Sequence, residues 1–119
     1  MDPLHELIWP WFRAFCFTQL IEVPIYGKLL GIRPSIAFGA SMLTHPYVWF
    51  VFPPLVFGWG GNYVVMCVVA EVFAWLGETA YFAHYFGVPI KRAAVGSLVA
   101  NGTSFGLGLL LRHVFHAPI

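Results

Sequence analysis

The stretch VVAEVFAWLGETAYFAH, residues 68–84, decides the fold class, because it is almost wholly apolar and yet contains two glutamates, Glu71 and Glu78. The whole chain has 119 residues, of which 60% are hydrophobic and only 9% are charged. In soluble proteins about a quarter of residues are charged, whereas a helix that spans a bilayer needs about 20 predominantly apolar residues. The composition therefore predicts a single all-α domain, residues 1–119, that lies within the lipid bilayer.

Three short connections divide the chain into four apolar segments. The connections are GIRPS at 31–35, GWGGN at 58–62 and GVPIKR at 87–92, and each contains the glycine or proline that is typical of turns. Short connections make successive helices antiparallel neighbours. The sequence thus predicts a polytopic four-helix bundle with spans at about residues 8–30, 35–57, 63–86 and 92–112.

The first two of these segments are rich in proline. Pro10 and Pro24 fall in the first, and Pro46, Pro53 and Pro54 fall in the second. Proline removes a backbone hydrogen bond and crowds the preceding turn. We therefore expect both segments to be kinked or locally unwound.

The distribution of basic residues predicts the orientation in the membrane. Lys28 and Arg33 flank the first connection, Lys91 and Arg92 lie in the third, and the second has no Lys or Arg. Basic connections favour the cytoplasmic side, so the first and third connections are predicted to lie inside and both termini outside. The remaining basic residues within the spans, Arg13 and Arg112, are near span ends and can reach the interface.

Aromatic residues near the ends of the spans are typical of the two membrane interfaces. Tyr26 and Tyr85 are close to the predicted inner ends of their segments. We expect both to belong to an inner aromatic belt.

An internal repeat relates the two halves of the chain at an offset of 56 positions. The offset aligns Phe17 with Phe73, Leu20 with Leu76, Glu22 with Glu78, Gly31 with Gly87, Ala37 with Ala93 and Ser41 with Ser97. Each half contains two spans, so the repeat predicts two tandem helical hairpins that insert the same way round. Such a parallel repeat has its pseudo-twofold axis along the membrane normal.

The repeat also predicts a polar site in the middle of the membrane. At 1.5 Å per residue, Glu22, Glu78, His45 and Asn101 all lie at mid-membrane depth, and Glu71 lies two turns from Glu78 on the same face. We expect these groups to converge, with serines beside them. The predicted ion, proton or polar site comprises Glu22, Glu78, Glu71, His45, Asn101, Ser41 and Ser97.

Ionised carboxylates are costly in hydrocarbon, and no Lys or Arg lies at this depth. Glu22 and Glu78 must therefore take up a proton, bind a cation, or accept hydrogen bonds from neighbours, including a charged His45. These three residues are also candidate metal ligands, although the sequence names no cofactor. The alternative is simple packing: Asn101, Ser97, Ser104 and Thr44 are each typical of interhelical hydrogen bonding, and His45 before Pro46 is equally typical of a kink.

The segments SMLTHPYVWF (41–50), AEVFAWLGETAYF (70–82) and GSLVANGTSFGLGLLL (96–111) together resemble small bacterial four-span integral membrane proteins. The resemblance covers residues 35–112, and it rests on the following positions: Thr44, His45, Pro46, Glu71, Glu78, Tyr81, Ser97, Asn101 and Ser104. It implies an origin in a bacterial cytoplasmic membrane. It implies no activity and no cofactor.

Three classes of function fit these observations. The first is a transport or channel component that binds a cation or relays protons at the glutamates, as a homo-oligomer or in a larger complex. An organic substrate is less expected, because so small a bundle should offer little cavity volume. The second is a structural subunit of a larger membrane complex, and the third, less favoured, is a metal- or haem-binding protein. Nucleic-acid binding is excluded, because a net charge of +1 provides no basic surface.

Overall fold

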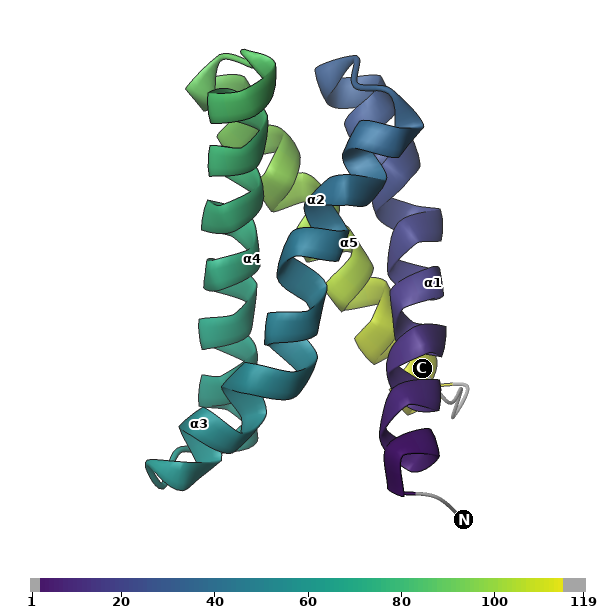
Figure 1. Cartoon of the computed structure of the whole chain (residues 1–119), viewed down its shortest axis with the longest axis vertical. Helices are drawn as coiled ribbons and strands as arrows, with labels where there is room; N and C mark the ends of the chain where they lie inside the picture. The colour runs from purple at the N-terminus through teal and green to yellow at the C-terminus, as the bar shows by residue number, and fades with distance from the viewer. Residues whose placement is uncertain (1–2, 115–119) are drawn as a thin grey trace.

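The computed structural model describes residues 3–114, and these residues form an all-helical bundle (Figure 1). The elements are α1 (Pro3–Leu30), α2 (Pro34–Pro46), the π-helix η1 (Tyr47–Val51), α3 (Phe52–Gly58), α4 (Tyr63–Phe86) and α5 (Ile90–Val114). Because α2, η1 and α3 follow one another without a gap, the described residues form four helical rods. The predicted all-α class is confirmed.

The predicted segments agree closely with the observed rods. The bounds of α4 are those predicted, α5 extends two residues further at each end, and α1 begins earlier, at Pro3. By length and composition, α4 and α5 are the two helices in residues 3–114 that could cross a membrane. The second rod consists of helical pieces of 13, 5 and 7 residues, each shorter than a span.

The prolines act differently in the first two rods. α1 continues as one α-helix through Pro10 and Pro24, so the expected unwinding of this segment is not observed. In the second rod the helix changes to π geometry between Pro46 and Pro53, and the Phe52 N–H donates to the carbonyl of Tyr47, five residues back. The prolines on both sides remove the regular donors of neighbouring turns, which favours the change of hydrogen-bond pattern at this place.

The first and third connections have the same local geometry. Gly31 and Gly87 adopt left-handed backbone angles, with φ of 65° and 67°. In each case a helix ends one residue before the glycine, and the next begins three residues after it. Left-handed backbone suits glycine because it has no Cβ. The two turns are 56 positions apart.

The rods form a ring in which α1 and α4 each pack against both α2 and α5. The best-packed part lies toward the first and third connections, at the upper end in Figure 1. Its core is made of two aromatic rings, larger aliphatic side chains and several alanines: Tyr26, Leu30, Ala37, Ala40, Phe82, Val88, Ala93 and Ala100. The alanines and Gly96 allow the helix backbones to approach closely. The Tyr26 side chain is fully buried here, so the expected place in an aromatic belt is wrong.

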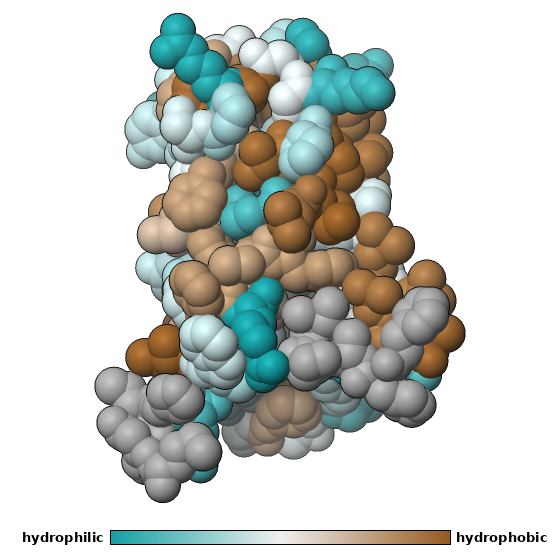
Figure 2. Space-filling view, turned by 90° about the vertical axis from the view of Figure 1, so that its right-hand side faces the viewer, coloured by the Kyte–Doolittle hydropathy of each residue, from teal (hydrophilic) through white to brown (hydrophobic). Residues whose placement is uncertain are grey.

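The outer surface is strongly apolar. Many large hydrophobic side chains are exposed along all four rods, including Leu20, Leu43, Val64 and Leu76. Figure 2 shows hydrophilic residues gathered at the end with the first and third connections and apolar residues over much of the middle. At that end Arg92 Nε donates to the Leu29 carbonyl at 2.9 Å, which joins the first turn of α5 to the last turn of α1. A surface of this kind, together with α4 and α5, agrees with a location in a membrane.

Candidate functional site

A cavity of about 300 Å³ occupies the half of the bundle away from the packed core. Its wall on α4 is one helix face that runs from Tyr63 through Cys67, Ala70 and Glu71 to Glu78. Tyr63 and Arg112 are exposed at one end of this wall, where the cavity reaches the surface, and Glu78 is buried at the other. The cavity therefore leads from the end of the bundle that carries Pro3 and Val114 toward its centre.

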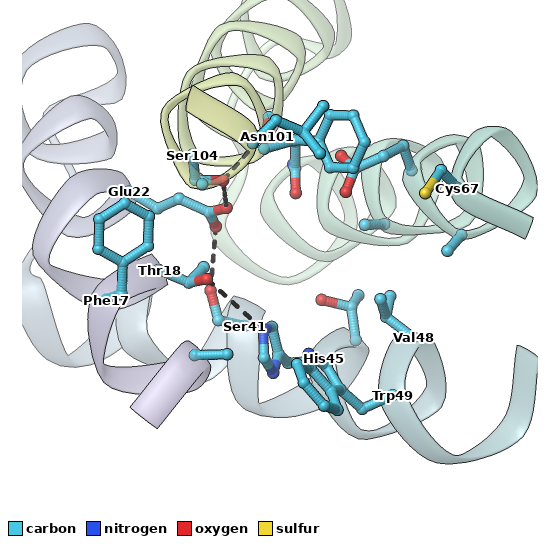
Figure 3. Close-up of a pocket in the computed structure, with 18 of the residues that line it drawn as sticks. Phe17, Thr18, Glu22, Ser41, His45, Val48, Trp49, Cys67, Asn101 and Ser104 are labelled. Carbon is cyan, nitrogen blue, oxygen red and sulfur yellow. Dashed lines mark hydrogen bonds between the residues drawn. The ribbon is translucent and has the colours of Figure 1, made fainter. Parts of the chain in front are cut away.

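Glu22 projects from α1 into the deep part of the cavity and is 2% exposed. Its Oε1 accepts a hydrogen bond from Ser41 Oγ of α2 at 3.1 Å, and its Oε2 accepts one from Ser104 Oγ of α5 at 2.6 Å. Figure 3 shows the carboxylate between the two hydroxyls. Three helices thus meet at this side chain.

Glu78 has an equivalent environment on α4 and is 1% exposed. Its Oε1 accepts a short hydrogen bond from the Tyr26 hydroxyl of α1, and its Oε2 accepts one from Thr44 Oγ1 of α2 at 2.9 Å. No Lys or Arg among residues 3–114 forms an ion pair with it. Each buried glutamate is therefore held by two hydroxyl groups, and the two hydroxyls of a pair lie on different helices.

Asn101 and Ser97 lie beside Tyr26 and extend this polar cluster into α5. Asn101 Nδ2 is 2.9 Å from the Ser97 carbonyl and 3.4 Å from the Tyr26 hydroxyl. Ser97 Oγ donates to the Trp75 carbonyl of α4 at 3.2 Å. Ser97 therefore supports the site from behind the cavity wall, whereas Asn101 lines the cavity.

One hydroxyl beside each buried glutamate has a backbone acceptor within reach. Thr44 Oγ1 is 3.3 Å from the Ala40 carbonyl, and Ser104 Oγ is 3.2 Å from the Asn101 carbonyl. A hydroxyl can donate one hydrogen bond and accept others. If a glutamate is protonated, its partner hydroxyl can turn its own hydrogen to the backbone and accept from the carboxyl group. Each site can thus stabilise both the charged and the neutral form.

Glu71 lines the same cavity nearer its mouth, seven residues before Glu78. Its side chain is partly buried, and no described residue makes a hydrogen bond with it. Of the three glutamates in residues 3–114 that line the cavity, Glu71 is the one without a hydrogen-bond partner among the described residues.

His45 lies on the cavity wall among aromatic side chains. Its ring centroid is 5.3 Å from that of Phe15, 6.3 Å from that of Trp11 and 6.5 Å from that of Trp49. Its Nε2 is 3.5 Å from Thr18 Oγ1, and its Nδ1 is buried without a hydrogen-bond partner. His45 faces the cavity, but Ser41, Ser104, Tyr26 and Thr44, rather than His45, hold the two buried glutamates.

The candidate metal ligands Glu22, Glu78 and His45 do not form one ligand group. Within residues 3–114, no set of three or more His, Cys, Asp or Glu side chains is arranged to hold a metal ion. The cavity offers carboxyl groups, hydroxyls, one amide and one imidazole in its deeper part, and the Cys67 thiol and Arg112 guanidinium nearer its mouth.

The structure brings most of the predicted site residues together. Glu22, Glu71, Glu78, His45, Asn101 and Ser41 line one cavity, and Ser97 lies directly behind it. Thr44 and Ser104, expected only as packing contacts, bind the glutamates, and the role of Tyr26 was missed. One signal was available for Tyr26: it lies four residues after Glu22 and therefore on the same helix face.

Comparison with known proteins gives no further assignment: no family model, no curated protein and no solved structure matches the chain.

Proposed function

We propose that the protein is a small membrane transport component in which Glu22 and Glu78 bind and release protons at the end of a one-sided cavity. The observation that carries this proposal is that each buried carboxyl group pairs with two hydroxyls. In each pair, one hydroxyl has an alternative backbone acceptor. A site that only stabilised a fixed charge would need donors alone. Donors that can become acceptors suit a group whose protonation changes.

A bound inorganic cation is the alternative occupant. Carboxylate and hydroxyl oxygens are suitable ligands for such an ion. However, every carboxylate oxygen of Glu22 and Glu78 already accepts a hydrogen bond from a hydroxyl. A cation would have to displace these hydrogens, whereas a proton would only reverse their direction.

The proposal includes four membrane spans with both termini outside, in a bacterial cytoplasmic membrane. Lys28, Arg33, Lys91 and Arg92 support this orientation, since all four lie in or within three residues of the first and third connections, and basic residues favour the cytoplasmic side. The cavity then faces outward. Tyr26 and Phe82 pack between it and the cytoplasmic connections, so transfer across the membrane requires these two rings to separate. Four helices are few for a pore, so we expect a homo-oligomer or a larger complex.

Infrared difference spectroscopy of the protein in lipid tests proton binding directly. A pH step should produce a carboxylic acid band that decreases in Glu22→Gln and in Glu78→Gln, because these variants remove the titrating groups. Proteoliposomes with an internal pH dye should show proton flux that both variants abolish. The matched control is Glu6→Gln, which removes an exposed carboxylate outside the cavity. Undiminished flux in Glu78→Gln would contradict the proposal.

A structural subunit is the second candidate function. It is favoured by an apolar groove on the outside of α4 and α5, lined by Val64, Val68, Val72, Leu98 and Gly102 among others. Purification in mild detergent separates the two functions. A stoichiometric partner together with absent proton flux would support the structural role, whereas flux from the purified chain alone would contradict it.

A further inference from the structure

The cavity is larger than a proton or a bare metal ion requires. Its volume of about 300 Å³ is at the lower end of the range of small-molecule sites, and a water molecule in the liquid occupies about 30 Å³. The space exists because small side chains line its inner faces, including Ala14, Ala70 and Ala74. The expectation that so small a bundle offers little cavity volume is therefore wrong.

The middle of the cavity holds a carboxyl group, that of Glu71, with which no described residue makes a hydrogen bond. Glu71 lies about 12 Å along α4 from Tyr63 at the mouth and about 10 Å from Glu78 at the base. Among residues 3–114, Arg112 is the one Lys or Arg that lines this cavity. Its Nη1 donates to the Tyr63 hydroxyl at 3.2 Å. Glu71 is thus placed to pair with a cation that comes from outside.

Aromatic rings contribute much of the remaining wall. Phe17 of α1, Trp49 of η1 and Phe105 of α5 line the cavity together with Glu71. Aromatic faces attract cations, most strongly where water is excluded, and they offer good contact to an apolar body. A hydrated inorganic ion gains little from such walls, whereas an organic ammonium ion can use both the rings and the carboxylate.

We infer that the cavity binds a small organic cation with an apolar body, with Glu71 as its counter-ion and Phe17, Trp49 and Phe105 as its apolar contacts. This inference rests on the proposed function, because it names the substrate class of the same cavity. Glu22 and Glu78 retain the role of proton binding beneath it. Entry of a cation at Glu71 then favours release of a proton from Glu22 or Glu78, since the cation and the proton both bring positive charge to the same cavity.

Calorimetric titration of the protein in lipid nanodiscs tests the inference, with benzyltrimethylammonium as the probe. We expect saturable binding to the unmodified protein and none for phenylacetate, which has the same ring but the opposite charge. Glu71→Gln should weaken probe binding at least tenfold, because it removes the counter-ion and no hydrogen bond of the fold. Glu6→Gln is the matched control and should change the affinity less than twofold.

A second variant tests the position of the ligand. Ala70 is 2% exposed and lines the cavity, so Ala70→Leu should fill the space next to Glu71 and abolish probe binding without changing any charge. The unfolding temperature of both variants shows whether the bundle is intact, and Glu71→Gln alone decides the inference if Ala70→Leu does not fold.

The outcomes distinguish this inference from the proposed function. Equal affinity of Glu71→Gln and the unmodified protein, equal binding of phenylacetate, or no binding of the probe at all would each overturn the inference. The infrared signal of Glu22 and Glu78 is recorded without the probe. If it persists in these cases, the proposed proton binding stands while the organic substrate class falls.

Discussion

Tyr26 and Phe82 occupy equivalent positions 56 residues apart in the chain, and they contact each other at the centre of the bundle with ring centroids 4.6 Å apart. Both side chains are fully buried. Each lies four residues, or about 6 Å, from a glutamate on its own helix. The pair therefore lies about one helical turn beyond the glutamates at the deep end of the cavity, and the Tyr26 hydroxyl also binds Glu78.

Tyr26→Phe should destabilise the protein by about 1–2 kcal/mol, because it removes the Tyr26 hydroxyl from the buried Glu78 carboxyl group and leaves Thr44 as the other hydroxyl partner. The ring contact with Phe82 is retained, so the loss reports the hydroxyl. The free energy of unfolding in mixed detergent measures the effect. Tyr85→Phe, at a tyrosine that is 71% exposed, is the control and should have little effect. Equal losses in the two variants would contradict the role of the Tyr26 hydroxyl.

Two glycines of α5 should respond to alanine in opposite ways. A Cβ on Gly96 would lie 2.8 Å from Leu30 Cδ2 in the packed core, whereas a Cβ on Gly102 would meet nothing within 4 Å. Gly96→Ala should therefore cost about 1–3 kcal/mol of stability. Gly102→Ala should be neutral or stabilise by up to about 1 kcal/mol, because alanine favours helix. Detergent unfolding compares them, and a larger loss for Gly102→Ala would show that the packing of α5 is misassigned.

Ser104 and Glu22 should be energetically coupled through their 2.6 Å hydrogen bond. In a double-mutant cycle of Ser104→Ala and Glu22→Gln, we expect a coupling of about 0.5–2 kcal/mol in the free energy of unfolding. Ser35 is exposed on α2, so Ser35→Ala with Glu22→Gln serves as the control pair. That pair should be additive within about 0.5 kcal/mol. Additivity of both pairs would mean that the serine does not stabilise the carboxyl group.

Labelling of single cysteines tests the membrane orientation. Trp59→Cys and Ser35→Cys place a thiol near the second and first connections, in a background with Cys16→Ser and Cys67→Ser. Both positions are exposed. A maleimide that does not cross membranes should label the Trp59→Cys protein in intact cells and the Ser35→Cys protein only after lysis. The reverse pattern would place the cavity mouth in the cytoplasm.

The sequence predicted the helices well because hydropathy and turn residues are local signals. The predicted bounds of α4 were correct, and Glu22 and Glu78 were correctly predicted to lie in one polar site. The reason is that the constant rise of a helix converts residue number into depth. The partners of these glutamates were harder to predict. Whether Ser104, Thr44 or Asn101 contacts a given carboxyl group depends on the rotation of each helix about its axis, which is set by packing of alanine and glycine against neighbouring rods.

The π-helix η1 was also beyond a precise prediction. The prolines indicated a disturbance in the first two rods, but only the second shows π geometry. Pro10 and Pro24 are 14 residues apart in α1, so each affects a separate turn, whereas Pro46 lies two turns from the adjacent pair Pro53 and Pro54. The second rod thus loses backbone donors on both sides of η1 within two turns, whereas α1 loses them at two well-separated turns.

The five residues of η1 change the rotation of α3 about the rod axis relative to α2. A π turn holds one residue more than an α turn, so α3 is rotated by about 100° from where an unbroken α-helix would place it. This offset brings Pro53 to the cavity wall and buries Val56, which is 1% exposed. Removal of a single residue between 47 and 51 would reset the angle, turn Val56 toward the outer surface, and alter the shape of the cavity without changing any acidic residue.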